Sequence, residues 1–202
     1  MKLKMLSVTS SLVLSLCSVT ALAGSFKLNP ERNQYSNLAW PFLESDSKWK
    51  VTTGSDLHSG ADRYADDYNY HDGNKGGDID LGKSVYSVMG GKVIYADRLP
   101  GYGYGNQVVV LDDSGKFAVR YAHLNSMSVS EGDTITRQST LIGGVGKTGL
   151  RGSCTAPNWA CAHLHIVLYE NLSRNDISLL KRGKMPSSSS AAWFRLDASL
   201  KP

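Results

Sequence analysis

The sequence lacks the HExxH motif, in which one helix face presents two histidines to a zinc ion. Although the chain contains five histidines, this absence excludes the common helical zinc-protease arrangement. Amphipathic patterns of helix length are also missing between Val51 and Tyr169, and there is no internal repeat or sign of a second domain. These absences direct attention to a single, mainly β domain.

Long apolar runs are missing after residue 23, so no later segment is long enough to span a bilayer. The chain opens with MKLKMLSVTSSLVLSLCSVTALAGS, where two lysines precede an apolar stretch. That stretch ends in Ala-Leu-Ala, the small-x-small form that signal peptidase cuts. We therefore predict a signal peptide over residues 1–23, cleaved after Ala23, and a secreted or periplasmic protein.

Charge of either sign is sparse and nearly balanced. The chain has 22 Lys and Arg against 18 Asp and Glu, and the loss of Lys2 and Lys4 with the signal peptide leaves 20 against 18. This excess of basic residues is too weak to indicate nucleic-acid binding. It does not oppose association with an anionic cell wall.

Cysteine is scarce, with three residues, and Cys17 leaves with the signal peptide. The remaining pair, Cys154 and Cys161, is even in number and close in sequence, which predicts a disulfide in an oxidising compartment. A short loop of this kind contributes about 2–3 kcal/mol in the entropic model. The bridge would fix the loop that leads into His163. Two thiolate ligands for zinc are the alternative.

Strand signals recur between glycine-containing turns along the middle of the chain. The segments are SVYSVM, KVIYA, NQVVVL, KFAVRYAHL and AHLHIVLYE. Turn chemistry at residues 90–91, 112–115 and 131–133 separates them. They predict an antiparallel sheet system. A short helix is predicted over Asp176–Arg182, followed by a flexible serine-rich loop and a polar tail.

The stretch ACAHLHIVLYE places His163 and His165 on the same face of a strand, because side chains two residues apart point the same way. An HxH pair alone is more often a polar strand face than a metal site. His58 and His123, however, also lie at loop–strand junctions, where functional side chains concentrate. His71 lies in the polar stretch NYHDGNKGG, and we assign it to a solvated loop.

Several segments, in order along the chain, resemble the lysostaphin-type, or β-lytic, zinc metalloendopeptidases, which cut peptide bonds in bacterial peptidoglycan. These segments are YADDYN, DLGKSVYSVMGGKVIYA, GYGYGNQVVVL, YAHLNSMSVSEGDTI, IGGVGKTG and AHLHIVLYE. The resemblance covers roughly residues 40–170. It implies a mainly β domain with a compact antiparallel sheet, similar to the duplicated hybrid motif, with a groove and few short helices. On this basis residues 24–50 form a lead-in, 51–170 the peptidase catalytic domain and 171–202 a C-terminal extension packed on it.

The resemblance also implies a Zn²⁺ site held by His58, Asp67 and His165. The alternative carboxylate is Asp62, because HSGAD has the His–Asp spacing of many members. The strand context of YADDYN favours Asp67.

The remaining two histidines of the pattern, His123 of the YxHL motif and His163 of the HxH motif, match the pair that handles the water molecule and the transition state. Which of the two is the general base stays open. Asp78 and Asp80 are interpreted as turn residues.

Aromatic residues outside this pattern are assigned to packing or to the surface. Tyr102 and Tyr104 of PGYGYGN could contact substrate, but a glycine-rich hairpin with exposed tyrosines explains them equally well, so both are left out of the site. The Trp40 and Trp49 cluster is interpreted as core.

The sequence thus predicts a monomeric zinc endopeptidase that acts on peptidoglycan peptides, with neither nucleic-acid nor membrane-spanning roles. The first rival is a non-catalytic activator of other wall hydrolases, a role found in family members that have lost ligands. Here all five expected positions are filled. The second rival is a carbohydrate-binding β domain, which would need no metal. The bond cut, a glycyl bridge or a D-amino-acid cross-link, stays open. The sequence also leaves open whether the enzyme attacks other bacteria or remodels the cell's own wall, and whether residues 24–50 are inhibitory.

Overall fold

The computed structural model describes residues 38–53, 58–71, 78–101, 103–150 and 161–202. The predicted signal peptide, the lead-in before residue 38, Tyr102 and Cys154 lie outside these ranges. The predictions made for them, including the Cys154–Cys161 bridge, therefore stay predictions.

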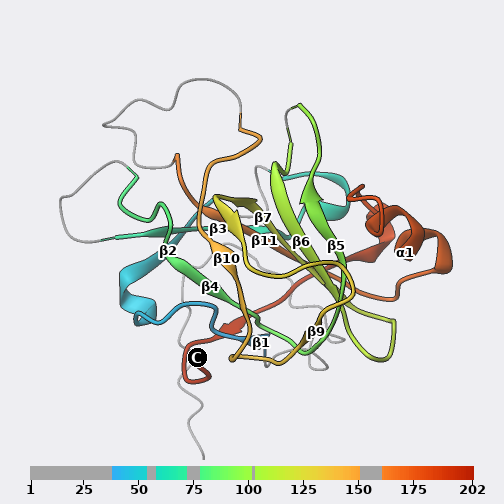
Figure 1. Ribbon diagram of the computed structural model, residues 1–202. Helices are drawn as coiled ribbons and strands as arrows, with labels where there is room; N and C mark the ends of the chain where they lie inside the picture. Colours follow the sequence, from blue (N-terminus) through green and yellow to red (C-terminus); the bar gives the residue numbers. More distant parts are fainter. Residues whose placement is uncertain (1–37, 54–57, 72–77, 102, 151–160) are drawn as a thin grey trace, which may run out of the picture.

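The described residues form a large antiparallel sheet that runs through the centre of the molecule (Figure 1). Its strand order is β2-β3-β11-β7-β6-β5-β9, with β12 paired to β11. Five strands agree with the segments expected from the sequence, counting β4 of a second sheet. The bounds in the large sheet are β2 Trp49–Thr53, β3 Asp66–Tyr70, β5 Gly91–Arg98, β6 Asn106–Leu111, β7 Ala118–Leu124, β9 Thr134–Ile135, β11 Leu164–Tyr169 and β12 Ala191–Ala192.

A second antiparallel sheet has the order β4-β10-β8 and packs beside the first. Its strands are β4 Ser84–Tyr86, β8 Ser126–Met127 and β10 Leu141–Gly144. The two-stranded ladder of β1 Leu38–Ala39 and β13 Leu196–Asp197 is parallel, which the sequence did not indicate. It joins the start of the described chain to its C-terminal end.

Helical structure is limited to short pieces in the described ranges. Helix α1, Arg174–Leu180, begins two residues before the predicted Asp176 because Ser173 and Asp176 form a capping box. The 3₁₀ turns are η2 Asp46–Lys48, η3 Gly60–Asp62 and η4 Ser188–Ser190. None of these helices has the length and apolar character needed to cross a membrane.

Strand β11 separates two apolar clusters, because its side chains alternate between faces. Leu164, Ile166 and Leu168 belong to the main core. Val167 and Tyr169 belong to a smaller core on the other side, and His163 and His165 precede them on the same face.

Aromatic residues of the N-terminal part complete the main core, as expected for Trp40 and Trp49. Phe42 stacks on Trp49 with ring centroids 3.5 Å apart, and Trp40 packs edge-on against Tyr68. The C-terminal half of the lead-in is therefore part of the packed domain.

Candidate active site

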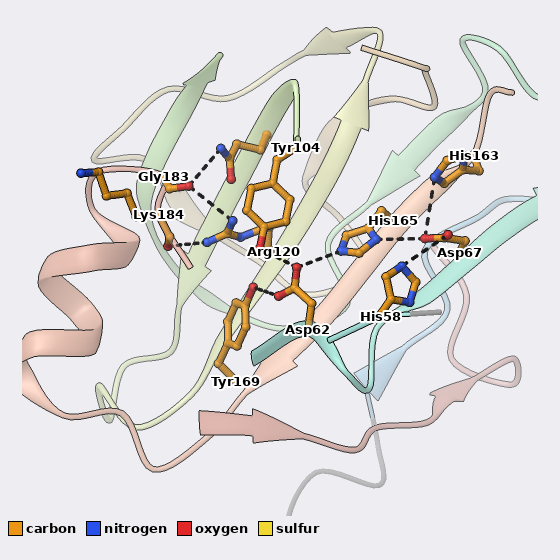
Figure 2. A network of polar contacts seen from close by, with 11 residues as sticks. His58, Asp62, Asp67, Tyr104, Arg120, His163, His165, Tyr169, Gly183 and Lys184 are labelled. Atoms are coloured by element: carbon orange, nitrogen blue, oxygen red, sulfur yellow. Dashed lines mark hydrogen bonds and ion pairs between the residues drawn. The ribbon is translucent and has the colours of Figure 1, made fainter. Parts of the chain in front are cut away.

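The centre of the site lies on the ladder between β3 and β11, where Asp67 is directly paired with His165. Asp67 Oδ1 lies 2.9 Å from His165 Nδ1, and Asp67 Oδ2 lies 3.5 Å from His58 Nε2 (Figure 2). One possible ligand atom from each of the three residues lies within 4.8 Å of the others. Within the described ranges, this is the one group of three or more His, Cys, Asp or Glu side chains that could hold a metal ion.

Two further histidines stand beside this group. The rings of His123 and His163 have centroids 4.8 Å apart, and His163 Nε2 lies 3.7 Å from Asp67 Oδ1. His123 Nδ1 lies 2.9 Å from the carbonyl oxygen of Thr148, and His163 Nδ1 lies 3.1 Å from that of Cys161. A carbonyl oxygen can only accept, so both Nδ1 atoms carry the proton and both Nε2 atoms keep a free lone pair.

A close backbone approach brings these two histidines together. Gly146 forms a β-bridge with His163, and a Cβ at Gly146 would lie 2.2 Å from Asn125 N and 2.5 Å from the carbonyl oxygen of His123. His123 itself has φ of 60°, a left-handed conformation that is uncommon outside glycine. Glycine at position 146 is thus required for this segment to approach the backbone of His123 and His163 so closely.

A second buried carboxylate lies on the other side of His165. Asp62, at the end of η3, is 5% exposed and accepts hydrogen bonds from the hydroxyls of Tyr104 and Tyr169. Its Oδ2 lies 3.6 Å from His165 Nε2, longer than a hydrogen bond. Asp62 therefore faces His165 from the side opposite Asp67 (Figure 2).

Tyr104 belongs to the site, contrary to the sequence prediction that left it out. Its ring centroid lies 5.9 Å from that of His165, and its carbonyl oxygen accepts a hydrogen bond from His123 N–H. The glycines around Tyr104 indicated only a hairpin. The partner that makes it part of the site, Asp62, lies 42 residues away in sequence, and no local pattern reports that contact.

Arg120 on β7 is fully buried and packs against the ring of Tyr104. Its guanidinium carbon lies 3.7 Å from the centroid of the Tyr104 ring. The guanidinium donates to the carbonyl oxygens of Gly183 and Lys184 in the C-terminal segment. This segment, predicted to pack on the domain, therefore contacts the support of the site.

The electrostatics of the site favour charged carboxylates beside a charged His165. Burial alone raises the pKa of Asp67 and Asp62, but the contacts with His165, together with His58 for Asp67 and the two tyrosines for Asp62, outweigh it. The pKa of Asp67 ends well below its usual range, and that of Asp62 falls to about 2. Burial lowers the pKa of His165, but Asp62 and Asp67 overcome it and raise the pKa to about 9.

The other two histidines are shifted in the opposite direction. Burial, reinforced by the charges of His165 and His163, lowers the pKa of His123 to about 3. Burial also lowers the pKa of His163, against the attraction of Asp67. Both imidazoles are therefore neutral near pH 7 and can accept a proton at Nε2.

An open cavity gives solvent access to the cluster. Its lining residues are His58, Asp62, Gly103, Tyr104, His123, Gly149, Leu150, His165 and Met185. The polar side chains among them come from the cluster, while Leu150 and Met185 supply apolar contact. His71, Asp78 and Asp80 are not part of this lining.

Comparison with known proteins identifies the family. The sequence pattern of Peptidase family M23 matches residues 72–177, just over half of the chain. The chain belongs to peptidase family M23. The matched M23 range includes His123, His163 and His165, whereas His58 and Asp67 precede it. The placement of the last two beside His165 therefore comes from the structure.

The sequence of this M23 chain is similar to those of two lysostaphins. Those of Staphylococcus staphylolyticus and Staphylococcus simulans are each 28% identical over 124 residues, 61% of this chain. The chain spans less than a quarter of the length of these curated relatives, 23% and 22%. A solved structure of the antimicrobial peptidase lysostaphin from Staphylococcus simulans has a TM-score of 0.51 at 22% identity, covering 78% of this chain and 50% of that one. This likeness shows a shared fold.

Proposed function

We propose that the protein is a secreted zinc metalloendopeptidase that hydrolyses peptide bonds in peptidoglycan cross-links or cross-bridges. The observation that carries the proposal is the convergence of His58, Asp67 and His165, next to two neutral histidines, beside an open cavity that His58, His123 and His165 line, in an M23 chain. The similarity to lysostaphin supports peptidoglycan as the substrate.

The donor set fits zinc. Two imidazoles and one carboxylate are a usual ligand set for catalytic zinc, which keeps its fourth position open for water. Here their donor atoms lie within 4.8 Å of one another, and the cavity reaches both His58 and His165. When bound, a zinc ion would lower the pKa of a water molecule and polarise the scissile carbonyl.

His123 and His163 would handle the protons of the reaction. Each ring is oriented by its Nδ1–H bond to a backbone carbonyl, so each presents Nε2 as an acceptor. One of the two takes a proton from the attacking water. The Nε2–H formed in this way can donate a hydrogen bond to the developing oxyanion, or pass its proton to the leaving amine.

Export belongs to the same proposal. The N-terminal pattern ending at Ala23 would direct the chain out of the cytoplasm. In the oxidising compartment outside, a Cys154–Cys161 bridge would form. The exported protein would act as a monomer. Cell-wall peptides are then within reach of the cavity.

The test is to incubate the purified, zinc-loaded protein with two walls, one glycine-bridged and one directly cross-linked, and to identify the released ends by mass spectrometry. New glycyl termini identify a bridge-cutting enzyme, and opened direct cross-links identify a cross-link peptidase. A chelator-treated sample is the control. If the zinc-loaded protein releases no product from either wall, the proposal is wrong and a non-catalytic activator explains the chain better.

A further inference from the structure

We propose that Asp62 is a positioning residue for the metal site: its carboxylate holds the proton on Nε2 of His165, so that Nδ1 of the same ring is free for the metal ion. This inference rests on the proposed function, because it requires a metal ion bound by His165. It assigns Asp62 a role different from the ligand role that its spacing from His58 suggested.

His165 lies between two buried carboxylates. Its two ring nitrogens face two different carboxylates, Asp67 Oδ1 at 2.9 Å from Nδ1 and Asp62 Oδ2 at 3.6 Å from Nε2. Nδ1 is therefore the nitrogen on the side of Asp67 and His58, where the other possible ligand atoms lie. A neutral imidazole has one N–H and one lone pair, so a metal ion at Nδ1 places the proton on Nε2.

The Nε2 atom of His165 is buried. His165 is 4% exposed, and its Nε2 has no hydrogen-bond partner within range among the described residues. A buried N–H without an acceptor destabilises the folded state, because its hydrogen bond to water is lost and not replaced. The carboxylate of Asp62 is placed to be that acceptor, since an approach of roughly half an ångström would give an ordinary N–H···O distance. Metal-bound histidines usually donate their other N–H to such a partner.

Two tyrosine hydroxyls orient the carboxylate of Asp62. Tyr169 donates to Oδ1 at 2.7 Å, and Tyr104 donates to Oδ2. Two donors fix the plane of the carboxylate and aim Oδ2 at His165 (Figure 2). They also hold Asp62 away from the Asp67 side of the ring. The carboxylate is therefore oriented as an acceptor from His165.

The support of Tyr104 extends this arrangement to the C-terminal segment. Arg120 stacks on the Tyr104 ring, and its guanidinium is fixed by the carbonyl oxygens of Gly183 and Lys184. Among the described residues, no carboxylate lies within ion-pair distance of Arg120. Burying a guanidinium without such a partner costs free energy of folding. Here it orients the tyrosine that orients Asp62.

The experiment measures zinc affinity by competition with a chromophoric chelator in the full protein and in Asp62→Asn. We expect binding about 10- to 100-fold weaker in the variant, the usual effect of losing a partner of a metal-bound histidine. Tyr104→Phe should weaken binding less, since Asp62 keeps its charge. Asp176→Asn is the matched control, because it removes a buried, hydrogen-bonded carboxylate from the cap of α1 and should leave zinc affinity unchanged.

Two spectroscopic measurements separate positioning from ligation and from a general loss of structure. Cobalt-loaded Asp62→Asn should keep the absorption spectrum of the unmodified site, whereas Asp67→Asn should change it. In the zinc-loaded unmodified protein, long-range ¹H–¹⁵N spectra should show His165 protonated at Nε2. This last measurement keeps the proposal testable if Asp62→Asn does not fold.

The outcomes are distinct. Zinc affinity in folded Asp62→Asn equal to that of the unmodified protein, or His165 protonated at Nδ1, overturns the inference. So does a cobalt spectrum altered as in Asp67→Asn, which would make Asp62 a ligand. If the unmodified protein binds no zinc, or His58→Ala and His165→Ala bind it unchanged, the proposed function itself fails.

Discussion

Asp67 and His165 face each other across the β3–β11 ladder, with Oδ1 of the carboxylate 2.9 Å from Nδ1 of the imidazole. Because a ladder fixes the distance between directly opposed side chains, this pair is held by backbone hydrogen bonds that do not depend on a metal ion. The strands thus present the carboxylate and the ring together, and His58 joins them from the segment before β3.

The two histidines of the HxH motif should respond differently to substitution. His165→Ala should lose zinc and activity together, because it removes a ring nitrogen from the metal-capable group. His163→Ala should keep zinc but lose turnover by about 10²–10⁴-fold, the range for a proton-transfer group. Metal content after dialysis and release of peptidoglycan fragments measure both. Full zinc occupancy in His165→Ala would contradict the ligand assignment.

His123 combines a strained backbone with a proposed proton-transfer role. Asparagine tolerates a φ of 60° better than most residues, so His123→Asn should fold with equal or higher thermal stability and retain zinc. Its turnover should fall by about 10²–10⁴-fold. Gln138→Asn is the control, since Gln138 has φ of 65° and lies outside the cavity lining. Turnover at the unmodified level in His123→Asn would exclude His123 from the reaction.

Gly146 should tolerate no side chain. Gly146→Ala places a Cβ within 2.2 Å of Asn125 N, so the bridge to His163 must shift. We expect a loss of about 1–3 kcal/mol in the free energy of unfolding, measured by urea denaturation, and lower turnover. Gly90→Ala is the control, because its Cβ would meet only Ile135 O at 3.5 Å. Equal stability of the two variants would show that the close approach is not required.

Asp80 should make stability depend on pH. Burial, aided by the charge of Asp78, raises the pKa of Asp80 to about 6 despite the hydrogen bonds donated by Tyr70 and Asn69. The ordinary value is 3.8, so between pH 4 and 6 the folded state binds more protons than the unfolded state. The free energy of unfolding contributed by Asp80 therefore falls as pH rises through this window.

Asp80→Asn removes that titration. Urea denaturation at pH 4, 5, 6 and 7 should show that the stability of Asp80→Asn relative to the unmodified protein increases as pH rises and levels off above pH 6. A difference that does not change with pH would mean that Asp80 keeps an ordinary pKa in the folded protein.

The local structure that the site uses follows from short stretches of sequence. Alternation in AHLHIVLYE placed His165 of β11 and His163, directly before that strand, on the same face, because side-chain direction in extended chain depends only on position along it. Turn residues and apolar runs likewise indicated the strands and the mainly β fold. The ordered motifs indicated the family. Each of these signals depends on residues that are close together in the sequence.

Which distant side chains meet follows from the packing of the whole domain. From the sequence, both Asp62 and Asp67 were candidates for the carboxylate ligand that accompanies His58, with Asp67 favoured. The register of β3 against β11 sets Asp67 beside Nδ1 of His165 and leaves Asp62 facing Nε2. Tyr104 meets Asp62 across 42 residues and Tyr169 meets it across 107. Contacts of this kind depend on strand pairing and chain reversal over the whole domain, so no local pattern of residue types encodes them.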